Sequence, residues 1–131
     1  MNDLVNMTAI DALAEITSEQ LANIIARGAD EKKAEDIVLL SVADECYLTD
    51  YFVIVTGFSK AQMRAIADSI ESKVKEELQR HPLRVEGKAE ASWILQDYGD
   101  VIVHIFLPRE REFYNLEAFW SHAQRIDFQR F

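Results

Sequence analysis

The chain of 131 residues contains one cysteine and lacks long apolar runs and clusters of basic residues. Cys46 alone cannot form an internal disulfide, which favours the reducing cytosol as the compartment. No apolar run approaches the ~20 residues that a membrane-spanning helix needs. No basic residue precedes Arg27, so the sequence predicts neither a secretory signal nor an Arg-rich transit peptide. We therefore expect a cytoplasmic protein without a membrane anchor.

The formal net charge of −9 argues against nucleic acid as the main partner. Nucleic-acid binding depends on the neutralisation of phosphates by Lys and Arg. The densest basic pair, Lys32 and Lys33, is flanked by Asp30, Glu31 and Glu35. The acidity favours a basic protein partner. A surface that only keeps the protein in solution is the alternative that charge alone leaves open.

The usual motifs for nucleotide and metal chemistry are also missing. Gly57-Phe58-Ser59 lies at a strand-to-helix junction, where phosphate loops occur, but it matches neither the P-loop nor the GxGxxG pattern. The histidines His81, His104 and His122 stand roughly 20 residues apart, without Cys or carboxylates at ligand spacing, which argues against a zinc site. We expect no cofactor and no metal.

The most informative stretch, Trp93–Trp120, predicts a strand, a tight turn, a strand and a helix. The strands are expected at Trp93–Asp97 and Val101–Leu107, and Gly99 between them can adopt the positive φ of a short hairpin. The second strand is apolar on both faces, as in strands covered on both sides, and Pro108 ends it. The following helix is expected to carry one apolar stripe, made of Phe113, Leu116 and Trp120.

Hydrophobic periodicity predicts two more helices before this stretch. A capping box at Thr17–Gln20 begins a short helix, which Gly28 is expected to end. Ser59 caps the longest helix, Lys60–Arg80. The stripe of that helix faces the core and consists of Met63, Ile66, Ala67, Ile70, Val74 and Leu78.

The remaining strands complete the predicted fold. They are expected at Ile37–Val42, Tyr51–Thr56 and Leu83–Glu86. This order of elements predicts an α/β fold, a mixed sheet of about five strands with helices packed on it. We expect a single domain over residues 17–131, preceded by a mobile lead-in over residues 1–16.

Two acidic residues at the hairpin turn have alternative interpretations. Asp97 and Asp100 could hold a metal ion for phosphoryl transfer, but their spacing of three across a turn does not guarantee that they converge. Aspartates are also common in turns, where they bind the local backbone, and we favour this structural role or contact with a partner.

Tyr98, at the tip of the turn, is expected to be exposed and to serve as an anchor for a protein partner.

The chain from Ala34 to about Asp127 resembles the ribosomal silencing factor family, also called RsfS or Iojap. The matching segments are KKAEDIVLLSV, DYFVIVTGFSKAQMRAIADSI and VEGKAEASWILQDYGDVIVHIFLPREREFYNLEAFW. Ser41 departs slightly, because the family often has an acidic residue there. The resemblance implies a nucleotidyltransferase-like fold without the catalytic carboxylates, and a protein that is not an enzyme. A metal-dependent nucleotidyl or phosphoryl transferase using Asp97 and Asp100 is the alternative.

The resemblance also implies a partner and a docking face. Members of this family bind the large ribosomal subunit through its L-fourteen protein, block association with the small subunit and so repress translation, notably when nutrients are short. Family members can also self-associate, so the resemblance makes a homodimer of the free protein possible. The hairpin and the following helix would supply the contact residues. These are Trp93, Asp97, Tyr98, Asp100, His104, Phe106, Arg111, Tyr114 and Glu117.

Overall fold

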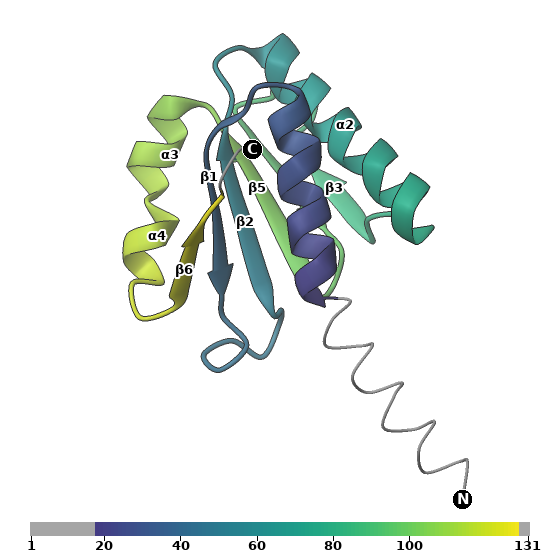
Figure 1. The fold of residues 1–131 in the computed structure, drawn as a ribbon. Coiled ribbons are helices and arrows are strands. Elements are labelled where there is room, and N and C mark those ends of the chain that lie inside the picture. The colour runs from purple at the N-terminus through teal and green to yellow at the C-terminus, as the bar shows by residue number, and fades with distance from the viewer. Residues whose placement is uncertain (1–17, 129–131) are drawn as a thin grey trace, which may run out of the picture.

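The computed structural model describes residues 18–128. The predicted lead-in over residues 1–16, and Thr17 of the predicted capping box, lie outside the described residues. The described part forms one six-stranded sheet with helices on both of its faces (Figure 1). The sheet has the order β3-β4-β5-β2-β1-β6. Its strands are β1 (Glu35–Ser41), β2 (Tyr51–Thr56), β3 (Arg84–Glu86), β4 (Trp93–Asp97), β5 (Val101–Phe106) and β6 (Gln124–Asp127).

The sheet is mixed, as predicted. β2 and β5 are parallel, and the other neighbouring strands pair antiparallel. These two strands lie at the centre and bury residues on both faces, in agreement with their continuous apolar sequences. The predicted number of about five strands missed β6. Its four residues are all exposed and mostly polar, so they carry no alternation signal, and only pairing with β1 makes them a strand.

The long helix α2 (Lys60–Leu78) agrees closely with its prediction. The backbone N–H of Gln62 donates to the Ser59 side chain at 3.0 Å, which is the expected cap. The helix ends at Leu78, slightly before the predicted end, and Gln79 caps it in a left-handed conformation. The predicted stripe is buried, with Leu78 packed at its margin.

The N-terminal helix continues to residue 31, so the predicted end at Gly28 is wrong. Gly28 instead allows this helix to lie directly against α2 (Figure 1). A Cβ atom at this position would lie 3.1 Å from the Ile70 Cα atom. The Ser69 hydroxyl also donates to the Gly28 carbonyl at 2.7 Å. Glycine therefore favours close packing of the two helices here and does not act as a stop.

The helix predicted after Pro108 is divided into α3 (Pro108–Tyr114) and α4 (Leu116–Phe119). Asn115 separates them in a left-handed conformation, with φ of 44°. This break rotates the two helices relative to each other, so the predicted single stripe is wrong. Leu116 and Trp120 pack on the sheet, but Phe113 is 78% exposed.

Each face of the sheet has its own hydrophobic core. The N-terminal helix and α2 cover one face, where the larger cluster includes Leu21, Ile66 and Val103. The α3–α4 segment packs on the other face, where Val38, Phe52 and Phe106 form the centre of a smaller cluster. Within residues 18–128, no helix has both the length and the apolar character needed to cross a membrane.

Candidate functional site

One surface of the sheet is only partly covered. Along β4, Ile94 and Gln96 are buried, whereas Trp93, Leu95 and Asp97 are half-buried. Because alternate residues of a strand point to opposite faces, β4 is covered by α2 on one side and left partly open on the other. Ile102 of β5 lies directly opposite Asp97 and is also half-buried. The Tyr114 ring of α3 packs 4.5 Å from the Trp93 ring, centroid to centroid. We call Trp93, Leu95, Asp97, Ile102 and Tyr114 the β4 face.

Charged side chains border this apolar surface on the edge strand β3. Arg84 pairs with Asp97 across the strands, with a nitrogen–oxygen distance of 3.6 Å. Glu86 lies opposite Leu95, and both charged side chains are exposed. An apolar centre with a polar border is the usual composition of a protein-binding surface.

His104 lies on the same side of the sheet as the β4 face, on the neighbouring strand β5 directly opposite Leu95. Its Nδ1 atom accepts a hydrogen bond from the Trp93 indole N–H at 3.1 Å. The ring is 6% exposed, and it packs edge-on against Phe52 and nearly parallel to Phe106. Burial lowers the pKa of His104 to about 4, so the imidazole is neutral at physiological pH.

Tyr98 does not project from the turn, and the prediction that it is exposed is wrong. It is 2% exposed and belongs to the larger core cluster. Its side chain follows Ile94 and Gln96 in the alternation of the strand, which directs it towards the helices and away from the β4 face. Burial raises the pKa of the Tyr98 phenol.

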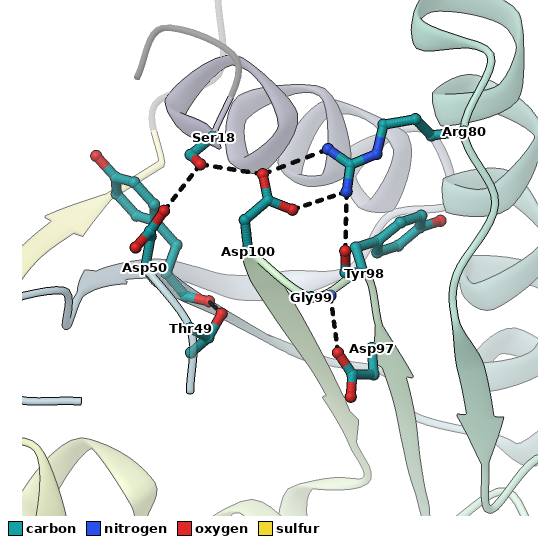
Figure 2. Close-up of polar contacts among 9 residues, drawn as sticks. Ser18, Thr49, Asp50, Arg80, Asp97, Tyr98, Gly99 and Asp100 are labelled. Atoms are coloured by element: carbon teal, nitrogen blue, oxygen red, sulfur yellow. Dashed lines mark hydrogen bonds and ion pairs between the residues drawn. The ribbon is translucent and has the colours of Figure 1, made fainter. Parts of the chain in front are cut away.

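Asp97 and Asp100 point to opposite sides of the turn (Figure 2). Asp97 accepts a hydrogen bond from the Gly99 N–H at 2.8 Å, and Gly99 has the expected positive φ of 91°. The favoured interpretation of Asp97 as a turn residue is therefore confirmed. The two carboxylates do not converge, as a shared metal ion would require.

Asp100 is instead part of a polar cluster that joins distant segments (Figure 2). The Arg80 guanidinium donates to both of its oxygens, at 2.8 and 3.3 Å, and to the Tyr98 carbonyl at 2.8 Å. The Ser18 Oγ atom lies 3.0 Å from carboxylate oxygens of both Asp50 and Asp100. Burial by itself would raise the pKa of Asp100, but the hydrogen bonds from Arg80 and Ser18 outweigh it and lower the pKa. The contact between Ser18 and Asp100 connects the N-terminal helix to the β4–β5 hairpin.

Arg111 and Glu117 form an ion pair inside the α3–α4 segment. Their closest nitrogen–oxygen distance is 3.0 Å, and the side chains are 11% and 21% exposed. Arg111 also donates to the Asp36 carbonyl at 2.7 Å and to the Thr56 hydroxyl at 2.9 Å. Arg111 therefore makes its hydrogen bonds inside the protein, and these connect the α3–α4 segment to β1 and β2.

The predicted contact residues therefore divide into two groups. Trp93, Asp97 and Tyr114 meet on the β4 face, with His104 beneath them. The others are buried or held by partners inside the protein, and their role as contacts stays a prediction. They are Tyr98, Asp100, Phe106, Arg111 and Glu117. Leu95 and Ile102 were not among the contact residues predicted from the sequence, although strand alternation places Leu95 on the same side as Trp93 and Asp97.

Comparisons with known proteins agree with the resemblance seen in the sequence. A model of the family described as ribosomal silencing factor during starvation matches residues 15–131. A ribosomal silencing factor from Halalkalibacterium halodurans is 36% identical over 114 residues, which cover 87% of this chain and 97% of that protein. A mouse protein named for mitochondrial assembly of the large ribosomal subunit is 33% identical over 93 residues, or 70% of this chain and 41% of that protein. A crystal structure of a Chromobacterium violaceum protein is similar with a TM-score of 0.75 and 30% identity, covering 86% of this chain and 92% of that one.

Proposed function

Because this chain belongs to the ribosomal silencing factor family, we propose that it docks through its β4 face on the L-fourteen protein of the large ribosomal subunit. The family consists of ribosome-binding factors and not of enzymes, so the phosphoryl-transfer alternative is set aside. Once docked, the protein blocks the approach of the small subunit by its bulk. Translation is thereby repressed, notably when nutrients are short.

This proposal rests on one observation, that the apolar side chains of the β4 face are only half-buried. Trp93, Leu95 and Ile102 are half-buried apolar residues on one face of the sheet, and aromatic anchors on protein-binding surfaces often dominate the binding energy. The net charge of −9 opposes direct binding to ribosomal RNA and favours a basic ribosomal protein. Asp97 and Glu86 provide acidic groups at the surface where a basic partner would arrive.

Sedimentation with separated ribosomal subunits tests the proposal. We expect the protein to pellet with large subunits, less with assembled ribosomes and not with small subunits. Leu95→Lys places a charge in the centre of the β4 face and should abolish pelleting. Ile126→Lys makes the same kind of change on β6, at the opposite end of the sheet, and should leave pelleting intact. Equal binding to both isolated subunits, or equal binding by both variants, would contradict the proposal.

Four further points belong to the same proposal. We propose that residues 17–131 act as one domain and that the protein works in the cytoplasm. The free protein is proposed to form a homodimer, which analytical ultracentrifugation over a concentration series would detect as a rise in mass.

The nucleotidyltransferase-like character of the fold stays a prediction. A structural superposition on members of that fold would test it.

A further inference from the structure

The Nε2 atom of His104 has no hydrogen-bond partner among residues 18–128. The atom is fully buried, in a residue that is 6% exposed. Buried polar groups in proteins are almost always paired, so an unpaired one needs an explanation. His104 lies beneath the surface that the proposed function assigns to docking, and it is held there by Trp93 of the β4 face itself.

The hydrogen bond from Trp93 determines the proton arrangement of this imidazole. An indole N–H can only donate, so the Nδ1 atom of His104 must be the acceptor. A neutral imidazole that accepts at Nδ1 carries its proton at Nε2. Burial keeps the ring neutral, since it lowers the pKa of His104 to about 4. Nε2 is therefore a donor, and its hydrogen is the unpaired group.

We infer that the His104 Nε2–H is a specificity-determining donor that binds a carbonyl oxygen of the docked partner. This inference rests on the proposed function and names the chemistry that the β4 face recognises. A neutral carbonyl is the fitting acceptor because the surroundings are the rings of Phe52, Trp93 and Phe106. A charged carboxylate would lose its hydration in this apolar setting, at high cost.

The position of His104 makes the donor reachable. His104 lies directly opposite Leu95 across β4 and β5, and Leu95 is a half-buried residue of the β4 face, so the partner reaches the ring past the Leu95 side chain while Trp93 keeps its hydrogen bond to Nδ1. The other unpaired buried atoms of the described chain are the Gln96 Oε1 and the Tyr98 hydroxyl. Both belong to the opposite side of β4, under α2, and a partner on the β4 face cannot reach them.

Two substitutions separate the donor from the rest of the ring. His104→Asn keeps an acceptor near the Nδ1 position for Trp93 but removes the distal donor. His104→Gln carries an amide N–H at about the Nε2 position and gives up the acceptor. We expect the Asn variant to bind purified large subunits roughly tenfold more weakly than wild type, or worse, because an acceptor of the partner is left unpaired. The Gln variant should bind within about threefold of wild type, since it restores that hydrogen bond.

Binding by the Asn variant at wild-type strength would overturn the inference, as would equal losses in both variants, which would indicate that ring shape alone matters. If the wild-type protein binds large subunits and the Asn variant binds equally well, only the donor role fails. If wild type does not bind, the proposed function fails, and the inference fails with it.

Nitrogen-15 NMR of the wild-type imidazole gives a second measurement, which does not depend on variants that could misfold. The His104 Nε2–H proton should move downfield when the isolated L-fourteen protein is added, because it enters a hydrogen bond. An unchanged signal in the saturated complex would overturn the inference.

Discussion

At the scale of single residues, Tyr98 contributes to folding. Its ring fills part of the larger core cluster between the hairpin and α2. We predict that Tyr98→Ala lowers the free energy of unfolding by about 3–5 kcal/mol, through loss of buried contacts and a cavity. Urea denaturation followed by circular dichroism measures this loss.

Tyr98→Phe is the matched control for this prediction. It removes only a buried hydroxyl that has no partner among the described residues, so we expect stability to be unchanged or slightly higher. A fully stable Tyr98→Ala protein would mean that the ring is not in the core.

His104 gives a prediction about pH at the same scale. Its pKa in the folded protein is about 4, below the value of 6.5 for an unburied histidine. Between these pH values the unfolded chain binds a proton that the folded chain does not, so the stability present above pH 6.5 is lost as the pH falls towards 4. We expect this loss to reach roughly 3 kcal/mol. Urea denaturation at several pH values measures it.

The control compares two histidines. His104→Asn should flatten the fall in stability between these pH values. His81→Asn, at an exposed position, should keep the wild-type slope. An identical pH dependence of wild type and the His104 variant would show that this imidazole is not buried in its neutral form.

At the scale of secondary-structure elements, the α3–α4 segment is held in place by Arg111. This side chain binds Glu117 and reaches across to Asp36 and Thr56. Its removal leaves the partly buried Glu117 carboxylate with only the longer contact to Arg125, at 3.8 Å, and takes a donor away from the Asp36 carbonyl and the Thr56 hydroxyl. We predict that Arg111→Ala lowers the free energy of unfolding by about 2–4 kcal/mol in urea denaturation.

Arg109→Ala is the comparison within the same helix. Arg109 is exposed, so this substitution should change stability by less than about 0.5 kcal/mol. If both variants lose the same stability, the loss reflects helix charge in general and not the contacts of Arg111.

At the scale of the whole molecule, the acidic surface should direct association with a basic partner. Glu86→Lys replaces attraction by repulsion at the border of the β4 face, where the exposed Glu86 lies opposite Leu95. We predict an association rate with large subunits at least several-fold lower than that of wild type, with a weaker dependence on salt. Stopped-flow fluorescence at several salt concentrations measures both quantities.

Glu76→Lys makes the same charge change at an exposed position on α2, on the opposite side of the sheet. It alters the net charge equally and should change the rate much less. Equal slowing by the two variants would mean that total charge, and not the β4 face, controls the encounter.

The sequence by itself determined the elements with strong local patterns. The apolar stripe of α2, the Ser59 cap, the strands β2 and β4 and the Gly99 turn all follow from residues close together in the chain. For the candidate site, the same patterns placed Trp93 and Asp97 on one side of a strand beside an aromatic helix. Periodicity and capping act within a few residues, which is why these features are readable without a structure.

Only the tertiary structure decided which side of each element is covered. The pattern of β4 allowed Tyr98 to face solvent or core, and the packing of α2 put it in the core. β6 forms because it pairs with the free edge of β1. Arg111 is a structural residue because the fold places Asp36 and Thr56, from distant parts of the chain, within hydrogen-bond distance of it. The unpaired Nε2–H of His104 likewise depends on the contact with Trp93 from the neighbouring strand. Such contacts join residues far apart in sequence, and their energies depend on burial and geometry that arise only when the sheet and its helices assemble.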